Sequence, residues 1–247
     1  MFKEQRTDRI LEIIRENKYV TVDTLVKRLH YSPATIRRDI TYLANLGLVK
    51  KSYGGVSVNA KSRPHILREH ENITEKIKMC RFAETFVSDG DVVFIDGTTT
   101  TYFLGETLLK KKDITVVTTN IKLAAYFGEH KVNCLVCGGR LYDGIMLGGT
   151  YACDLINKMR FNIAFFAVGG VSDDGQFSVS EAYWDFMRAA KARSEKTVLL
   201  NDKNKFDIKR NFFMSDLSFF DIVICDGEFP DGLKDKFPET EFLVAEE

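Results

Sequence analysis

The first thirty residues repeat apolar side chains at the spacing of two amphipathic helices. The apolar positions are Ile10, Ile13 and Ile14 in the first helix and Val22, Leu25, Val26 and Leu29 in the second. Residues three and four apart lie on the same face of a helix, so each set predicts one buried stripe. Thr21 precedes the second stripe and has the hydroxyl of an N-cap residue. The pattern predicts two short helices that share a core.

A third helix is predicted from Pro33 to Leu46. Ser32 suits the N-cap position, Pro33 suits the first helical position, and Gly47 tolerates the left-handed conformation in which helices often end. The inward positions of this helix are Ile36, Ile40 and Leu43. After it, residues 48–58 alternate in character, which predicts a short basic hairpin.

The outward side chains of the third helix and the hairpin suit DNA. The N–H groups of an arginine match a guanine edge or a phosphate, and hydroxyl groups reach phosphates. The predicted DNA-binding residues are Ser32, Ala34, Thr35, Arg37, Arg38, Thr41, Lys50, Lys51, Tyr53, Gly54 and Gly55. The alternative is a solvated helix face beside a structural hairpin. The helix spacing, the cap and the basic hairpin together favour a winged helix-turn-helix domain at residues 1–58.

The distribution of charge agrees with this interpretation. The chain of 247 residues has 35 basic and 35 acidic side chains, but residues 1–60 hold 11 Lys and Arg against 6 Asp and Glu. A basic N-terminal segment on an acidic body predicts an anionic partner for the first part alone. Chance over sixty residues could produce a similar excess, so charge adds only modest support.

The remaining residues have the pattern of an α/β domain. Residues 59–71 are predicted to be a linker, because they are polar, contain Pro64 and lack periodicity. From residue 72 onward, helical stretches alternate with short apolar runs, at 92–95, 115–117, 134–137, 164–168, 198–200 and 222–224. Such runs are typical of strands buried on both faces of a mainly parallel sheet. Residues 72–247 are therefore predicted to form an α/β domain.

Polar residues follow several of these apolar runs. The carboxyl ends of parallel strands meet at one edge of the sheet, where ligands bind in open α/β folds. Small residues there let backbone amides approach an anion, threonine hydroxyls add donors, and Asp96 is expected to accept from a ligand hydroxyl. The predicted effector-binding residues are Asp96, Gly97, Thr98, Thr99, Thr100, Thr119, Asn120, Gly138, Gly139, Arg140, Asp202 and Lys205. Four such loops at one edge favour a pocket for a polar, anionic small molecule.

Other classes of function find little support. No apolar run approaches the roughly 20 residues of a membrane helix, and the N-terminus lacks a signal-peptide core, so a cytoplasmic protein without a membrane partner is expected. Five cysteines make an odd number, which argues against a disulfide framework. Cys134 and Cys137 fall in a predicted strand and point to opposite faces, so no redox or zinc role is expected. The histidines lack metal-ligand spacing and no glycine-rich nucleotide motif is present, so neither metal nor cofactor is predicted.

The N-terminal module resembles the winged helix-turn-helix of DeoR-family bacterial transcriptional regulators. The resemblance covers Arg6 to Val56. It rests most of all on the run from Ser32 to Ile40, which matches the family pattern S-x-x-T-I-R-R-D-L with isoleucine in the last place, and on Tyr53-Gly54-Gly55. It implies that residues 32–41 enter the major groove of double-stranded operator DNA. Asp39 is expected to pair with an arginine of the same module instead of contacting DNA.

The second domain resembles the DeoR-family sensor domain, whose fold is similar to that of ribose 5-phosphate isomerase. The family motifs D-x-G-T-T, T-N, G-G and D-x-S-K-F correspond here to residues 96–99, 119–120, 138–139 and 202–206. The first motif is one residue shorter, and Asn204 replaces the usual serine. The resemblance implies that the effector is a phosphorylated sugar or a sugar-derived metabolite.

The leading prediction is a repressor of a sugar-metabolism operon that binds DNA as a homodimer or homotetramer, is controlled by a sugar phosphate and is not an enzyme. Two alternatives remain open: a sugar-phosphate isomerase fused to a DNA-binding domain, and a DNA-binding regulator without a ligand response. An isomerase needs a base beside the carbonyl group. The isomerase that the fold resembles uses a D-G-A-D-E motif, whereas the corresponding stretch here begins at Ala167 and reaches its first acids only at Asp173 and Asp174.

Overall fold

The structure is a computed structural model that describes residues 3–17, 19–45, 48–58, 68–69, 71–208 and 213–246. The chain divides into two compact units, Met1–Arg68 and Glu69–Glu247. Most of the predicted linker at residues 59–71, and the predicted end of the third helix at Leu46 and Gly47, lie outside the described residues.

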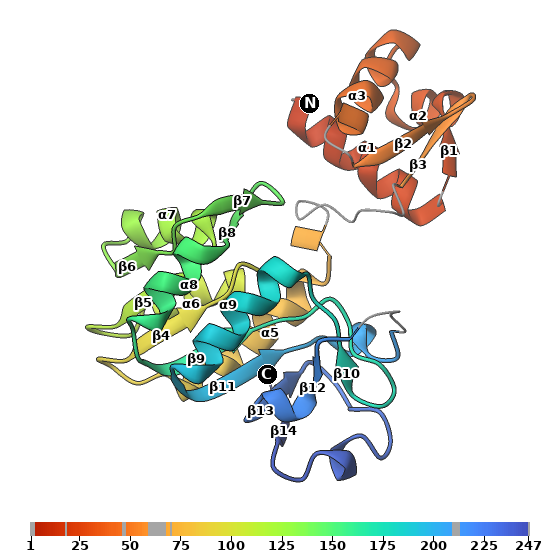
Figure 1. Cartoon of the computed structure of the whole chain (residues 1–247). Coiled ribbons are helices and arrows are strands. Elements are labelled where there is room, and N and C mark those ends of the chain that lie inside the picture. Colours follow the sequence, from red (N-terminus) through yellow and green to blue (C-terminus); the bar gives the residue numbers. More distant parts are fainter. Residues whose placement is uncertain are drawn as a thin grey trace. The chain divides into compact units, whose positions relative to one another are not determined.

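The first unit combines three helices with a small antiparallel sheet (Figure 1). The helices are α1 (Lys3–Asn17), α2 (Val22–Leu29) and α3 (Pro33–Asn45), and the strands are β1 (Tyr19–Thr21), β2 (Val49–Ser52) and β3 (Gly55–Val58). The strand order is β1-β3-β2, so the predicted hairpin gains a third strand that sequence reasoning missed. β1 has only three residues, too few for periodicity to reveal.

The predicted caps and buried stripes are confirmed in this unit. The backbone N–H of Thr24 donates to Thr21 Oγ1 at 3.1 Å, and that of Thr35 donates to Ser32 Oγ at 3.2 Å. The side chains at the inward positions of the helices form one core, with Ile10, Ile14, Leu25, Ile36, Ile40 and Leu43 buried. Because α3 is capped at one end and buried along one face, its opposite face is held outward.

The second unit contains a seven-stranded sheet in which every pair of neighbouring strands is parallel. Its strands are β4 (Val92–Ile95), β5 (Thr115–Thr118), β6 (Asn133–Val136), β9 (Phe161–Phe166), β11 (Ser194–Leu200), β13 (Ile222–Cys225) and β14 (Glu241–Val244). They lie in the order β14-β13-β11-β9-β4-β5-β6. The predicted α/β fold is confirmed.

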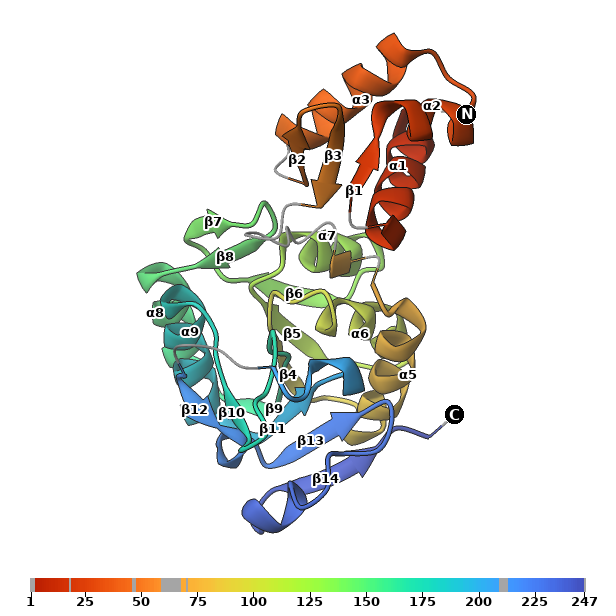
Figure 2. The same ribbon diagram turned by 90° about the vertical axis from the view of Figure 1, so that its right-hand side faces the viewer.

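Helices cover both faces of this sheet (Figure 2). α5 (Ile73–Ala83), α6 (Leu104–Leu108) and α7 (Ile121–Glu129) contribute to the core on one face, and α8 (Thr150–Asn157) and α9 (Glu181–Ala192) to the core on the other. Cys134 packs against the first core and Cys137 belongs to the second, so their predicted opposite orientation is confirmed, although β6 ends one residue before Cys137.

Several short strands were not predicted. β7 (Arg140–Tyr142) and β8 (Met146–Gly148) form an antiparallel hairpin after β6, and β10 (Gln176–Phe177) pairs with β12 (Ser215–Asp216). The edge strand β14 was also missed. Its two end residues are exposed and its two middle residues are half-buried, and its apolar run Phe242–Val244 is only three residues long. β9 begins at Phe161 instead of residue 164, because Asn162 interrupts the apolar pattern.

Candidate functional site

The outer face of α3 presents the predicted DNA-binding side chains to solvent. The exposed residues of the predicted set are Ser32, Ala34, Arg37, Arg38, Thr41, Lys50, Lys51, Tyr53 and Gly54, while Thr35 is half-buried. Within the described part of the chain, no carboxylate forms an ion pair with Arg37 or Arg38. Both guanidinium groups are therefore available to a phosphate or a guanine edge.

The β2–β3 hairpin is attached to this face. Lys51 Nζ donates to Thr41 Oγ1 at 2.9 Å, which joins β2 to α3. Tyr53 is fully exposed at the tip of the hairpin, next to Gly54, whose φ of 76° belongs to the left-handed region that favours glycine. Gly55, which was predicted to contact DNA, is instead buried, and a Cβ there would lie 2.5 Å from Tyr19 Oη. The packing inside the module therefore requires a residue without a side chain at this position.

A buried ion pair fixes the position of α3. Arg6 Nε and Nη2 donate to the two carboxylate oxygens of Asp39 at 2.5 and 3.1 Å. The Asp39 side chain is 1% exposed, and the hydrogen bond to it raises the pKa of Arg6. The guanidinium of Arg6 also lies 4.9 Å from the centre of the Tyr31 ring. The expected pairing of Asp39 with an arginine of its own module is confirmed, and the partner is Arg6 of α1.

We expect Arg37→Ala and Arg38→Ala to weaken DNA binding. An arginine that reads a base is worth about 1–3 kcal/mol, or roughly 5–150-fold in affinity, and removal of a phosphate contact lowers the salt slope by about 1. Titrations of operator DNA at several salt concentrations distinguish the two roles. Arg9→Ala is the control, because exposed Arg9 pairs with Glu12 on α1. If both variants match the wild type at every salt concentration, the assignment of the DNA-reading face is wrong.

The sheet order brings the predicted effector-binding loops to one edge. β9 separates β11 from β4, and β5 and β6 follow on the other side of β4. The polar segments after these parallel strands therefore meet at a common carboxyl edge, as expected for a ligand site of an open α/β sheet. The carboxyl-edge residues Asp96, Thr99, Thr100, Thr119, Asn120 and Asp202 are all buried.

Asp96 organises this edge from inside the protein. Its Oδ1 accepts from Thr98 N at 2.9 Å, Thr98 Oγ1 at 2.8 Å and Thr101 Oγ1 at 2.5 Å. Its Oδ2 accepts from Ala167 N at 2.7 Å and from the hydroxyl of Tyr183 on α9. A carboxylate offers about four lone-pair sites, so these five donors occupy it fully. The expectation that Asp96 accepts from a ligand hydroxyl is therefore corrected: it holds the Thr98–Thr101 turn in place.

Burial gives Asp96 a pH-dependent effect on stability. Loss of solvation raises its pKa, although the hydrogen bonds from Thr101, Tyr183, Thr98 and Ala167 oppose the shift. The native state then retains the proton to higher pH than the unfolded chain, so the Asp96 contribution to the free energy of unfolding falls as pH rises above the ordinary value of about 4.

As the pH rises above about 4, the wild type should lose unfolding free energy, whereas Asp96→Asn should not, because asparagine does not ionise. The stability of the variant relative to the wild type should therefore increase with pH. Urea titrations followed by the fluorescence of Trp184 report on the second unit, because Trp184 is the only tryptophan. Exposed Asp235 provides the control variant Asp235→Asn. A pH-independent difference for Asp96→Asn would contradict the expectation.

Two lysines flank the threonine turn. Lys205 Nζ lies 3.3 Å from Thr100 Oγ1 and 3.3 Å from Asp202 Oδ2, which places it at this edge. Lys76 Nζ lies 3.3 Å from Thr99 Oγ1, and Lys76 is only 2% exposed. Sequence reasoning missed Lys76, because one lysine in an amphipathic helix has no distinguishing spacing. Together the two ammonium groups and the adjacent hydroxyls form a cradle suited to an anion.

Several buried polar atoms beside the cradle lack a hydrogen-bond partner among the described residues. They are Thr119 Oγ1, Asn120 Nδ2, Asp202 Oδ2, which lies 3.3 Å from Lys205 Nζ, and both side-chain polar atoms of Asn201. Asn120 Oδ1, by contrast, caps α7 by accepting from Lys122 N and Leu123 N. Each buried unsatisfied group carries a penalty of about 1–3 kcal/mol, which a ligand or water that supplies the missing hydrogen bond removes. The carboxyl edge is therefore prepared for a polar ligand.

The β7–β8 hairpin forms the border of this edge. Leu147 N donates to Thr119 O at 2.8 Å, and a Cβ at Gly97 would lie 2.4 Å from Met146 Cγ. Gly139 has a φ of 129°, and a Cβ there would lie 2.2 Å from Gly148 O, so no other residue fits. Arg140 is exposed, and its guanidinium carbon lies 5.7 Å from the centre of the Tyr142 ring. The predicted glycines therefore shape the border backbone, and Arg140 is the charged side chain there.

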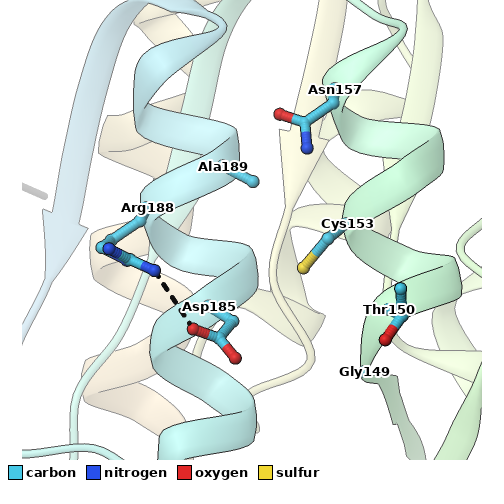
Figure 3. Close-up of a pocket in the computed structure, with 7 residues that line it drawn as sticks. All are labelled: Gly149, Thr150, Cys153, Asn157, Asp185, Arg188 and Ala189. Carbon is cyan, nitrogen blue, oxygen red and sulfur yellow. Dashed lines mark hydrogen bonds and ion pairs between the residues drawn. The ribbon is translucent and has the colours of Figure 1, made fainter.

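A surface pocket of about 460 Å³ lies elsewhere, between α8 and α9 (Figure 3). Its lining includes Cys153 of α8 and the pair Asp185 and Arg188 of α9, whose oxygen and nitrogen lie 3.3 Å apart. None of the predicted effector-binding residues lines it. The pocket is open and its ion pair is exposed, whereas the polar groups of the carboxyl edge are buried.

No group of three or more His, Cys, Asp or Glu side chains among the described residues is arranged to hold a metal ion. No helix in the described part has the length and apolar character required to cross a bilayer.

Comparisons with known proteins match both units. Residues 6–62 match the DeoR-like helix-turn-helix domain, and residues 71–227 match the DeoR C-terminal sensor domain. The chain is 28% identical to the glycerol-3-phosphate regulon repressor of Escherichia coli over 93% of both chains. It is 27% identical to the lactose phosphotransferase system repressor of Lactococcus lactis over the full length of both.

Among solved structures, ribose 5-phosphate isomerase A from Neisseria gonorrhoeae is similar over 55% of this chain and 54% of its own, with 18% identity and a TM-score of 0.40. The two family matches are separated by residues 63–70, around the boundary of the two units, and together extend over most of the sequence. The helix-turn-helix match agrees with the exposed arginine face of α3, and the sensor-domain match agrees with the parallel sheet and its polar carboxyl edge. The chain belongs to the DeoR family of DNA-binding transcriptional regulators.

Proposed function

We propose that this regulator is a repressor of a sugar-metabolism operon and that a phosphorylated sugar or sugar-derived metabolite controls its binding to the operator. The observation that carries the proposal is the cradle of Lys76 and Lys205 around Thr99 and Thr100. Ammonium groups and hydroxyls are the donors that phosphate oxygens accept from. The names of two relatives, which refer to glycerol 3-phosphate and to a lactose phosphotransferase system, support an effector of this class.

The DNA-binding half of the proposal rests on α3 and the β2–β3 hairpin. The predicted residues 32–41 would lie in the major groove, with Lys50 and Lys51 beside the backbone. We propose that the active form is a homodimer or homotetramer in the cytoplasm, because a symmetric regulator can contact two half-sites separated by whole helical turns. Effector binding would change operator affinity only through a difference in affinity for two arrangements, commonly 1–3 kcal/mol.

Catalysis is not part of the proposal. The segment after β9, from Ala167 to Gly170, carries no carboxylate, and the next acids belong to a turn in which Asp174 accepts from Ser172. Asp96, the buried acid nearby, already accepts from five protein donors. Formation of a ketose on incubation with ribose 5-phosphate would overturn this part of the proposal.

Fluorescence anisotropy with labelled DNA from the region upstream of the protein's own gene tests the function. The protein is titrated first, and then glycerol 3-phosphate and phosphorylated hexoses and pentoses are added one at a time. We expect tight binding that one of these compounds reverses. Tight binding that no compound alters would remove the effector from the proposal, and absence of binding would show that this DNA contains no operator for the protein.

A further inference from the structure

Asn201 occupies a defined position at the carboxyl edge. Its backbone N–H donates to Ile224 O at 3.0 Å, so the β11–β13 ladder extends through this residue. Side chains alternate along a strand, and Leu199 belongs to the core beneath α8 and α9. Asn201 therefore points to the α9 side of the sheet. The same alternation from Phe94 directs Asp96 to that side, in agreement with its hydrogen bond to Tyr183.

The amide of Asn201 is fully buried, and neither its oxygen nor its nitrogen has a hydrogen-bond partner among the described residues. The neighbouring Asp202 differs, since it accepts from Asn72 Nδ2 at 3.2 Å and lies beside Lys205. An isolated buried amide loses the hydrogen bonds that water would supply. A ligand that both donates to and accepts from this amide would restore them.

The distribution of charge indicates which part of a ligand meets Asn201. The cationic groups Lys76 and Lys205 lie at the Thr99–Thr100 turn, where a phosphate is stabilised. Asn201 itself carries no charge, and the adjacent carboxylate of Asp202 lies beside Asn72 and Lys205. A neutral hydroxyl, which donates and accepts as an amide does, suits the Asn201 end.

We propose that Asn201 is a specificity-determining residue that binds a hydroxyl group of the phosphorylated effector. The inference rests on the proposed function, because the phosphate at the lysine cradle places the rest of the ligand along the carboxyl edge. Asn201 selects among phosphorylated compounds by their hydroxyl groups, and the cradle binds the phosphate they share. A site that hydrogen-bonds a hydroxyl discriminates strongly against analogues that lack it, because its own polar groups are then left unpaired.

The test compares Asn201→Leu with the wild type in the full-length protein. Isothermal titration gives the dissociation constants of inorganic phosphate and of the phosphorylated sugar that the wild type binds most tightly in the effector panel. We expect the preference for the sugar phosphate over inorganic phosphate to fall by about 5–150-fold, which corresponds to the loss of about 1–3 kcal/mol when a buried polar group is left without its hydrogen-bond partner. The dissociation constant of inorganic phosphate should change less than about twofold. Asn204→Leu, on the exposed turn three residues later, is the matched control.

Stability distinguishes ligand recognition from a structural role. Leucine has nearly the shape of asparagine and removes two unsatisfied polar atoms, so the thermal midpoint reported by Trp184 should stay equal or rise. A lower thermal midpoint, together with an unchanged preference for the sugar phosphate over inorganic phosphate, would show that the amide stabilises the fold through a bound water. That result would overturn the inference. If Asn201→Leu does not fold, Asn201→Ala carries the same comparison. If the wild type binds neither inorganic phosphate nor any sugar phosphate, the proposed function fails, and the inference fails with it.

Discussion

Replacement of Lys76 by methionine is expected to abolish most of the affinity for a phosphorylated effector. Methionine keeps the length of the side chain but removes the charge beside Thr99. A hydrogen bond to a charged group is worth about 1.5–3 kcal/mol, so a loss of roughly 10–150-fold is expected, with a similar loss for Lys205→Met. Titration calorimetry with inorganic phosphate and the preferred sugar phosphate measures both effects. The operator affinity of the effector-free protein should be retained.

Lys203 provides the matched control for these variants. It lies on the same turn as Lys205, but its side chain is 56% exposed and its nearest acid, Asp226, is 3.9 Å away. Lys203→Met should therefore change phosphate affinity by less than about twofold, as expected for a screened surface charge. Equal effects of the Lys203 and Lys76 substitutions would show that general charge attracts the anion and would contradict a defined cradle.

Replacement of Arg6 by methionine is expected to destabilise the DNA-binding unit by about 3–5 kcal/mol, because it leaves the carboxylate of Asp39 buried and unpaired. That loss is comparable with the total stability of many small domains, so operator binding should fail. Amide hydrogen exchange of α3 in the full-length protein measures the effect on this unit separately from the second unit.

Two further variants separate the buried pair from surface charge. Arg9→Met disrupts a pair in which both side chains are more than half exposed, so it should cost less than about 1 kcal/mol. The double variant Arg6→Met with Asp39→Leu replaces the buried pair by apolar groups and should recover much of the stability. Equal losses in the Arg6 and Arg9 variants would contradict a dominant role for the buried pair.

Much of the candidate DNA-binding site could be predicted because its signals are local. Ser32 and Thr35 are three residues apart, so the cap of α3 follows from short-range hydrogen bonding. The inward stripe of α3 then determines which side chains face outward. The partner of Asp39 and the burial of Gly55 required tertiary structure, because Arg6 and Tyr19 lie 33 and 36 residues away from them in the sequence.

The effector site was less accessible to sequence reasoning. The polar loops and their common edge followed from parallel strand order, but the roles of individual residues did not. Asp96 was expected to meet the ligand, yet its partner Tyr183 lies 87 residues away and occupies the carboxylate. Lys76 was not predicted, since its contact with Thr99 depends on how α5 packs on the sheet.

The sequence by itself determined the two-part architecture, the capped recognition helix and the parallel order of apolar strands, because periodicity and capping act over a few residues. Tertiary structure alone decided which polar groups are satisfied and which are not. Asp96 and Asn201 both follow strands, but the carboxylate of Asp96 accepts from the distant residues Ala167 and Tyr183, while the amide of Asn201 is unpartnered. Burial and hydrogen-bond satisfaction depend on neighbours distant in the chain, and the chemistry of the effector site is therefore a property of the folded protein.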